Sequence, residues 1–261
     1  MSTLRKAIKN VRVVTDVALN SVGIRQSTSS VARQAQSWWR QPPVHKHSIY
    51  SHFRDGFDDA TWLNIGRESF DLFESFSSSM KFDRPAGRIV EWGCGGGANA
   101  VHFGREATQY IGIDVNEKTL AECGRQMELA GLTHFTPLLI DIPEPESVLQ
   151  KIPSPCDLFV CLYVFELFPS QSYGMRVLKI AHQLLRPGGM AMIQIKYSVN
   201  RATQSRGWGY KFGVANMTSY RIDEFWQHAT DAGFLPHCVH LMPQQRTVSD
   251  ERYAYFFLRK V

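Results

Sequence analysis

The chain has 261 residues, of which 44% are hydrophobic and 20% charged, a balance that fits a soluble globular protein with one substantial α/β domain and an appendage. No stretch approaches the about 18 consecutive apolar residues that would predict a membrane-spanning helix. The five cysteines lack C-x-x-C spacing. They indicate reduced thiols of a cytoplasmic protein rather than a disulfide framework or a zinc site, and we expect no bound metal.

The net charge of +5 is concentrated at the N-terminus. Residues 1–54 contain nine Lys and Arg against one acidic residue, Asp16, so the rest of the chain carries a net charge of −3. The body of the protein is therefore slightly acidic. This distribution does not indicate a nucleic-acid-binding surface, and we expect no nucleic-acid partner.

An amphipathic basic helix is predicted at residues 4–22, because apolar side chains recur there at spacings of three and four while Arg5, Lys9 and Arg12 lie on another face. This helix could pack on the body, or residues 1–22 could contact an anionic membrane surface and make the protein membrane-peripheral. A cleaved transit peptide also fits the composition. Residues 26–36 are rich in Ser and Gln and are interpreted as a linker, so residues 1–36 form an N-terminal arm.

A second segment, residues 37–84, is predicted to form a lid and a helix. Its stretch 44–68 is too aromatic for a tether and is expected to fold over the mouth of the main domain. His47, with its neighbour His45, is a candidate catalytic histidine, and Arg67 is a candidate partner for a ligand carboxylate. A surface or packing role remains open for each. Residues 69–82 are predicted to form a helix that leads into the main domain.

From residue 85 onward, predicted strands alternate with predicted helices, which is typical of an α/β fold with a doubly wound parallel sheet. Ligands of such sheets bind at the carboxyl ends of the strands, near the point where the strand order reverses. The last two strands lie close together in sequence and predict an antiparallel hairpin at one edge. The expected strands are 88–92, 109–114, 135–141, 156–163, 189–196, 234–242 and 252–260, and the expected helices are 98–107, 117–131, 144–151, 172–185 and 222–233.

The stretch 88–99, RIVEWGCGGGAN, joins a predicted strand to a predicted helix through a glycine turn. Glycine lacks a Cβ and tolerates positive φ, so a nucleotide-like ligand can contact the main chain there. The pattern G-x-G-x-G from Gly93 fits an S-adenosylmethionine loop, whereas G-x-G-x-x-A from the same glycine fits a dinucleotide fingerprint. Asp114, at the end of the second strand, suits both readings because both ligands present ribose hydroxyls.

Residues near the glycine turn and after it favour S-adenosylmethionine. Glu91 precedes the first glycine by two positions, where a carboxylate can interact with a positively charged amino-acid tail but serves a pyrophosphate poorly. Asp141, at the end of the third strand, can accept a hydrogen bond from an adenine amino group, and Ile142 can lie against the ring.

Residues 88–261 resemble the class I S-adenosylmethionine-dependent methyltransferases in E-x-G-x-G-x-G, Asp114, Asp141, FELF (165–168) and LLRPGG (184–189), which occur in that order. The resemblance implies a Rossmann-like seven-stranded sheet whose last strand is antiparallel, in a domain of residues 85–261. S-Adenosylmethionine is the implied cofactor. The implied contacts are Glu91, Gly93, Cys94 and Gly95 with the methionine moiety, Asp114 and Val115 with the ribose, Asp141 and Ile142 with the adenine, and the main chain of Cys161 and Leu162.

The acceptor is expected beyond the ends of the fourth and fifth strands. Glu166 is a candidate base or substrate ligand, although it could instead cap the next helix. Lys196 and Tyr197 end the fifth strand and are candidate substrate contacts. The polar and aromatic insertion 198–221 is read as an acceptor-binding loop rather than a plain surface excursion. Its candidate contacts are Tyr210, Tyr220 and Arg221.

These features predict a methyltransferase that acts on a hydroxyl of a sugar, a glycan or another small molecule. The closing stretch RYAYFFLRK (252–260) is similar to uncharacterised methyltransferases associated with polysaccharide biosynthesis. Three alternatives remain: a methyltransferase for a secondary metabolite or a phenolic lipid, a catalytically silent binding protein with the same fold, and a nicotinamide dehydrogenase. The sequence predicts no oligomeric state.

Overall fold

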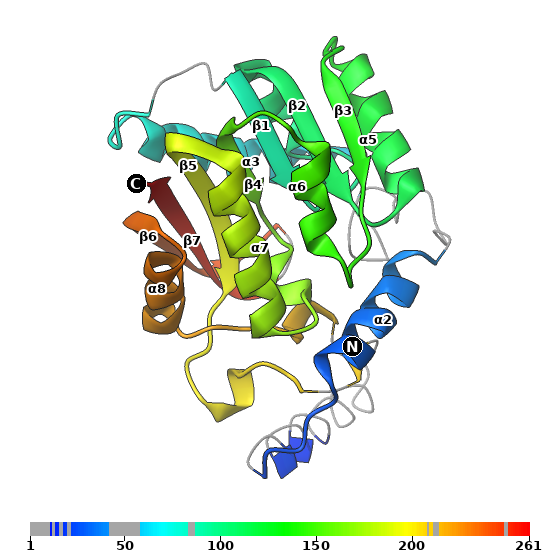
Figure 1. Cartoon of the computed structure of the whole chain (residues 1–261), viewed down its shortest axis with the longest axis vertical. Helices are drawn as coiled ribbons and strands as arrows, with labels where there is room; N and C mark the ends of the chain where they lie inside the picture. The colour runs from blue at the N-terminus through cyan, green and yellow to red at the C-terminus, as the bar shows by residue number, and fades with distance from the viewer. Residues whose placement is uncertain are drawn as a thin grey trace.

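The computed structural model describes residues 22–41, 58–82, 87–207, 209–210, 214–247 and 250–261, with residues 11, 14–15 and 18–19 (Figure 1). Its centre is a seven-stranded sheet of order β3-β2-β1-β4-β5-β7-β6. The pairs from β3 to β5 are parallel, and β7 runs antiparallel to both β5 and β6. The predicted fold is therefore confirmed. The strands are β1 (Gly87–Trp92), β2 (Ala107–Asp114), β3 (Phe135–Leu139), β4 (Cys156–Cys161), β5 (Leu185–Lys196), β6 (Phe234–Gln245) and β7 (Asp250–Lys260).

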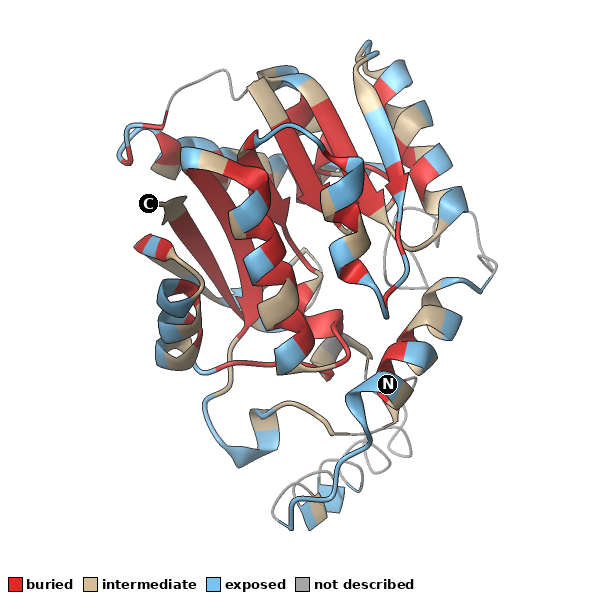
Figure 2. Ribbon diagram, in the orientation of Figure 1, coloured by how far each residue is buried: buried red, intermediate tan, exposed pale blue. Residues whose placement is uncertain are grey.

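Helices cover both faces of this sheet, and the alternation of side chains along each strand divides the core in two. Ile89 and Tyr110 pack on the side of α3, α4 and α5, whereas Val90 and Ile111 pack on the side of α6, α7 and α8. Figure 2 shows the buried strands between helices whose outer faces are exposed. The helices are α2 (Thr28–Trp39), α3 (Asp59–Ser77), α4 (Ala100–Phe103), α5 (Glu117–Leu129), α6 (Val148–Lys151), α7 (Gln171–Leu184) and α8 (Ile222–Asp231).

Two predicted helices are shorter than expected. The helix expected at 98–107 is α4 followed by a 3-10 turn at Gly104–Glu106, because β2 already begins at Ala107. The helix expected at 144–151 starts as a 3-10 turn at Pro145–Ser147 and continues as α6. Proline has no N–H to donate and therefore suits such a first turn.

The linker predicted at residues 26–36 is wrong, because most of it belongs to helix α2. Ser27 caps the helix by accepting a hydrogen bond from the Ser30 amide at 3.3 Å. Val31, Ala32 and Ala35 form a buried face that joins the core. The helix also runs across residue 36, where we expected the N-terminal arm to end. Composition suggested a tether here, but the three apolar residues at helical spacing give the helix a face that packs on the core.

Much of the predicted arm and lid lies outside the described residues, including 42–57 with His45 and His47. The described part of the lid, from residue 58, is the first half of α3, whose cap Asp58 accepts a hydrogen bond from the Thr61 amide at 2.7 Å. In the arm, Val11 and Val14 are helical and exposed. Among the described residues, none of the helices has the length and apolarity needed to cross a membrane.

Helix α3 lies directly against the glycine turn after β1. Gly66 in the middle of this helix is buried, and a Cβ built there would lie 1.8 Å from the carbonyl oxygen of Ala98. Phe70, one turn later, packs edge-on against Phe103 of α4 with ring centroids 5.2 Å apart. The close approach at Gly66 therefore fixes how near the helix stands to the turn.

We predict that Gly66→Ala destabilises the fold by roughly 2 kcal/mol or more, because the new methyl group overlaps main-chain atoms that cannot move independently. In an open helix the same substitution would stabilise by about 1 kcal/mol. Gly124→Ala in α5 is the comparison, because its Cβ would lie 3.3 Å from a ring carbon of Phe135, a tight contact with a side chain that can shift, and it should destabilise far less than Gly66→Ala. Urea denaturation of both variants measures the difference, and equal stabilities would contradict the packing argument.

Candidate active site

The glycine turn connects β1 to α4 in a conformation that requires glycine at several positions. Gly93, Gly95 and Gly97 have φ values of 75°, 53° and 99°. A Cβ on Gly93 would lie 2.5 Å from the side chain of Val164. The amides of Gly93 and Cys94 both donate to the carbonyl of Ile113, at 2.8 and 3.1 Å. The turn is thus held against the end of β2 and presents main chain rather than side chains.

Asp114, the last residue of β2, joins two loops at the carboxyl edge of the sheet. Its Oδ2 accepts a hydrogen bond from the Gly95 amide at 3.0 Å, and its Oδ1 accepts from the amides of Val115 and Asn116 at 2.7 and 3.0 Å. The carboxylate therefore fixes the glycine turn relative to the loop that starts α5.

Glu91 is buried, and each of its carboxylate oxygens has a partner within the protein. Asn99 Nδ2 donates to Oε1 and the hydroxyl of Tyr110 donates to Oε2, both at 2.7 Å. Burial raises the pKa of Glu91 to about 7, although both hydrogen bonds lower it. Sequence reasoning missed Asn99 and Tyr110. In this structure Glu91 ties β1 and β2 to the residue that precedes α4.

Cys94 is buried within the glycine turn, and its thiol lies against the thiol of Cys123 in α5. The hydrogen bond with Cys123, together with burial, raises the pKa of Cys94 well above its ordinary value. Cys161 and Leu162, at the end of β4, are also buried. The next residue, Tyr163, has a positive φ of 59°. The chain thus turns sharply where main-chain contacts were predicted.

Asp141 follows β3 and has partners in helix α2 that the sequence did not predict. Its Oδ1 accepts hydrogen bonds from Gln36 Nε2 at 2.7 Å and from a guanidinium nitrogen of Arg40 at 2.5 Å. The Ile142 amide donates to Gln36 Oε1 at 2.7 Å, while the Ile142 side chain is buried in the core. The signal that could have revealed these partners is the helical spacing of the small apolar residues in α2.

Beyond β4, Glu166 is 1% exposed, and neither carboxylate oxygen has a hydrogen-bond partner among the described residues. Burial raises its pKa to about 8, while the positive charge of Lys196 lowers it. The alternative that Glu166 caps the next helix is wrong. Ser170 caps α7 by accepting from the Tyr173 amide at 3.2 Å.

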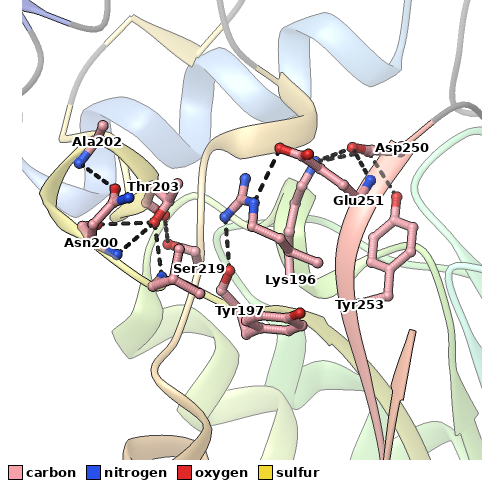
Figure 3. A network of polar contacts seen from close by, with 11 residues as sticks. Lys196, Tyr197, Asn200, Ala202, Thr203, Ser219, Asp250, Glu251 and Tyr253 are labelled. Carbon is pink, nitrogen blue, oxygen red and sulfur yellow. Dashed lines mark hydrogen bonds and ion pairs between the residues drawn. The ribbon is translucent and has the colours of Figure 1, made fainter. Parts of the chain in front are cut away.

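Lys196, at the end of β5, is buried in an ion pair with Asp250 (Figure 3). Its Nζ lies 2.6 and 2.7 Å from the two oxygens of Asp250, which also accepts a hydrogen bond from the Tyr253 hydroxyl at 2.9 Å. Tyr197 bonds instead to Arg252 through its main chain, with both contacts at 2.7 Å. Sequence reasoning found Lys196 and missed Asp250 and Tyr253.

Two of the three contacts predicted in the insertion 198–221, Tyr210 and Tyr220, are buried rather than on an open acceptor surface, which corrects our expectation, whereas the prediction for Arg221 stays untested. Tyr210 is buried, and its hydroxyl accepts from Trp39 Nε1 at 2.7 Å and donates to the carbonyl of Leu167 at 2.6 Å. Tyr220 is buried in an aromatic cluster of the core. Arg221 is exposed and pairs with Asp223 at the start of α8. Tyr210 and Tyr220 therefore face inward and hold the insertion in place.

For two other predicted site residues, Arg67 and His47, the described part of the structure shows no contact with the site. Arg67 lies on the exposed side of α3, one position after the glycine that packs on the turn. His47 falls outside the described residues. Within the part of the chain that the structure describes, no three His, Cys, Asp or Glu side chains form a group that could hold a metal ion.

Solved structures of methyltransferases share this fold. The N-methyltransferase NodS from Bradyrhizobium japonicum, in complex with S-adenosylhomocysteine, has a TM-score of 0.60 over 88% of this chain and 98% of its own, at 13% identity. The magnesium protoporphyrin IX methyltransferase ChlM from Synechocystis PCC 6803, with bound S-adenosylhomocysteine, has a TM-score of 0.61 over 88% of this chain and 100% of its own, at 12% identity. At these identities the likeness concerns the fold alone.

The curated sequence relatives align with this chain over less of their length than the solved structures do. An alignment of 169 positions, which covers 56% of this chain, is 27% identical to an mRNA cap guanine-N(7) methyltransferase from Eremothecium gossypii, of which it covers 38%. A segment of 115 residues, 44% of this chain, is 24% identical to a ubiquinone biosynthesis O-methyltransferase from Pseudomonas aeruginosa, of which it covers 45%. The chain thus matches less than half the length of either relative.

The family described as "Methyltransferase domain" matches residues 62–239, which is more than half of the chain. The match begins in α3 and ends in β6, so it includes every strand end that forms the site. The chain therefore belongs to the methyltransferase domain family.

Proposed function

We propose that this protein transfers the methyl group of S-adenosylmethionine to a hydroxyl of a small polar acceptor, with a sugar or glycan as the first candidate. The observation that supports this best is a row of carboxylates at the carboxyl ends of the parallel strands. Glu91, Asp114 and Asp141, at β1, β2 and β3, accept hydrogen bonds from the chain. Glu166, beyond β4, accepts none among the described residues. The three hydrogen-bonded carboxylates suit cofactor binding, and the one without a hydrogen-bond partner among the described residues suits proton transfer.

The residues of the cofactor side fit S-adenosylmethionine. The glycine turn carries no side chain at Gly93, Gly95 and Gly97, so a ligand can contact its main chain closely, while the amides of Gly93, Cys94 and Gly95 stay bonded to Ile113 and Asp114. Asp141 and the Ile142 amide together offer an acceptor beside a donor, which suits the amino group and ring nitrogen of adenine. We assign Glu91, Gly93, Cys94 and Gly95 to the methionine moiety, Asp114 and Val115 to the ribose, Asp141 and Ile142 to the adenine, and main-chain contacts to Cys161 and Leu162.

S-Adenosylmethionine supplies a methyl group already activated on its sulfonium, so the residues of the chain have to position the acceptor and take up its proton. We assign Glu166 as the base that receives the hydroxyl proton. A carboxylate with a pKa of about 8 is a stronger base than an exposed one. Lys196, held by Asp250, is assigned a positioning role, since its charge favours the ionised form of Glu166.

The proposal of a sugar or glycan acceptor rests on the polar side chains of the insertion, since its described tyrosines are buried. Asn200 and Thr203 form a capped turn, and the hydroxyl of Ser205 donates to the carbonyl of Ser219 at 2.8 Å. Tyr197, partly exposed at the end of β5, is the proposed aromatic contact. Because Tyr210 and Tyr220 face the core, they no longer support stacking on a sugar ring.

A phenolic lipid is the second candidate acceptor. It is favoured by the relative named ubiquinone biosynthesis O-methyltransferase. The exposed valines of the N-terminal arm would suit an enzyme that works at a membrane surface, and the protein is then cytoplasmic and membrane-peripheral. A phenol is more acidic than an aliphatic hydroxyl and would depend less on Glu166.

We predict that the protein binds S-adenosylhomocysteine and that Asp114→Ala weakens this binding roughly ten- to hundredfold. The substitution removes a charged hydrogen-bond partner of the ribose and releases the Gly95 amide. Isothermal titration calorimetry measures both affinities. Asp223→Ala, at an exposed carboxylate of α8, is the control and should bind as the unaltered protein does. Binding of NAD in place of S-adenosylhomocysteine would overturn the assignment in favour of a dehydrogenase.

We predict that Glu166→Gln lowers the rate of methyl transfer to an aliphatic hydroxyl roughly hundredfold while leaving the affinity for S-adenosylhomocysteine unchanged. Transfer of labelled methyl groups to a panel of sugars and phenols measures the rate. A loss with sugars only supports Glu166 as the base for an alcohol. Unchanged rates with every acceptor would exclude Glu166 as the base, and no transfer to any acceptor would favour a silent binding protein.

A stability measurement tests the burial of Glu166 independently of any acceptor. Its pKa is about 8 in the folded protein against an ordinary 4.5, so its contribution to stability is complete below pH 4.5 and is lost as the pH rises towards 8. The stability of Glu166→Gln relative to the unaltered protein should therefore increase by about 1.4 kcal/mol per pH unit across this range. Glu146→Gln is the control, because Arg176 lowers the pKa of Glu146 and its effect should be constant above pH 5. A flat difference for Glu166→Gln would contradict its burial in the protonated form.

A further inference from the structure

Helix α2 inserts one side chain into the place assigned to the adenine of the cofactor. Gln36 Nε2 donates to Asp141 Oδ1, and Gln36 Oε1 accepts from the Ile142 amide, both at 2.7 Å. A single carboxamide thus uses the carboxylate and the adjoining main-chain amide together. Both groups lie at the carboxyl end of β3, where the sequence predicted the adenine contacts.

The edge of a carboxamide and one edge of adenine carry the same hydrogen-bonding groups. In the carboxamide, an NH₂ donor and an oxygen acceptor are attached to one carbon. In adenine, the 6-amino donor and the ring nitrogen N1 are likewise attached to one carbon. An acceptor and a donor spaced to bind both groups of Gln36 are therefore spaced to bind both groups of adenine. The two cannot occupy Asp141 and Ile142 at the same time.

Several further contacts hold Gln36 in this position. Arg40, one turn later, pairs with Asp141 at 2.5 Å. Asn116 Nδ2 donates to the carbonyl of Trp39 at 2.7 Å, and Trp39 Nε1 donates to the hydroxyl of Tyr210, also at 2.7 Å. At the other end of the helix, the Gln26 amide donates to the carbonyl of Gly207 at 2.8 Å. Contacts at both ends therefore hold helix α2 against the rest of the protein. The carboxamide of Gln36 is fixed beside Asp141 and the Ile142 amide as a result.

We propose that Gln36 is an internal competitor for the adenine of the cofactor, so that cofactor binding must break both hydrogen bonds of this side chain. The inference rests on the proposed function, since it takes Asp141 and Ile142 as the adenine contacts. Its consequence is an apparent cofactor affinity below the intrinsic one, because only molecules with Gln36 displaced can bind. Removal of the carboxamide removes that penalty.

The test is the affinity of the full chain for S-adenosylhomocysteine, measured by calorimetry for the unaltered protein, Gln36→Ala and Gln34→Ala. Loss of the two hydrogen bonds should tighten binding to Gln36→Ala roughly three- to tenfold. Gln34→Ala makes the same chemical change two residues away, where the side chain accepts from the Tyr210 amide at 3.3 Å and from no other group of the described residues. It should bind as the unaltered protein does. Thermal unfolding shows that each variant is folded.

A second variant tests the role of the donor. Gln36→Glu keeps the length of the side chain, but its carboxylate cannot donate to Asp141 and is repelled by it. It should therefore also bind S-adenosylhomocysteine more tightly than the unaltered protein. Tighter binding to both Gln36 variants, with Gln34→Ala unchanged, supports the competition.

Three results would overturn this inference while leaving the proposed function intact: equal affinities for all the proteins, weaker binding to Gln36→Ala, or an equal gain for Gln34→Ala. The second would make Gln36 part of the cofactor site, and the third would mean that any loosening of α2 has the same effect. If none of the proteins binds S-adenosylhomocysteine, the proposed function fails, and the inference fails with it.

Discussion

The carboxylate of Asp114 is the contact on which the arrangement of the site depends. It accepts hydrogen bonds from Gly95 in the first loop and from Val115 and Asn116 in the second. Without it, the Gly95 amide would lose its partner on β2, and the distance between the glycine turn and the loop that starts α5 would be less defined. A group that binds at this edge therefore meets a preformed surface rather than a mobile loop.

What the sequence predicted well was local. The alternation of strands and helices, the glycine turn, and acidic residues at the ends of β2 and β3 are patterns within short stretches, and the sheet confirmed their order. What it missed depends on contacts between distant segments. Gln36 lies 105 residues from Asp141, and the Ser- and Gln-rich composition around it suggested a linker. Only the docked helix shows that Val31 and Ala35 are core residues.

The acceptor side shows the same division between local and distant information. Lys196 was expected near the acceptor because it ends a strand, but its partner Asp250 lies 54 residues away on β7 and could not be inferred from spacing. Tyr210 and Tyr220 were expected on an open surface because the insertion is otherwise polar. They are instead the residues that anchor it, since an aromatic side chain in such a loop gains more from burial than from exposure.

The central claim is that one row of strand ends binds S-adenosylmethionine, with its adenine in the place that Gln36 occupies here. A crystal structure of the full chain with S-adenosylhomocysteine tests it most directly. We expect the ribose on Asp114, the adenine on Asp141 and the Ile142 amide, and the carboxamide of Gln36 turned away from both. A ligand bound elsewhere on the protein, or an adenine that leaves Gln36 bonded to Asp141, would contradict it.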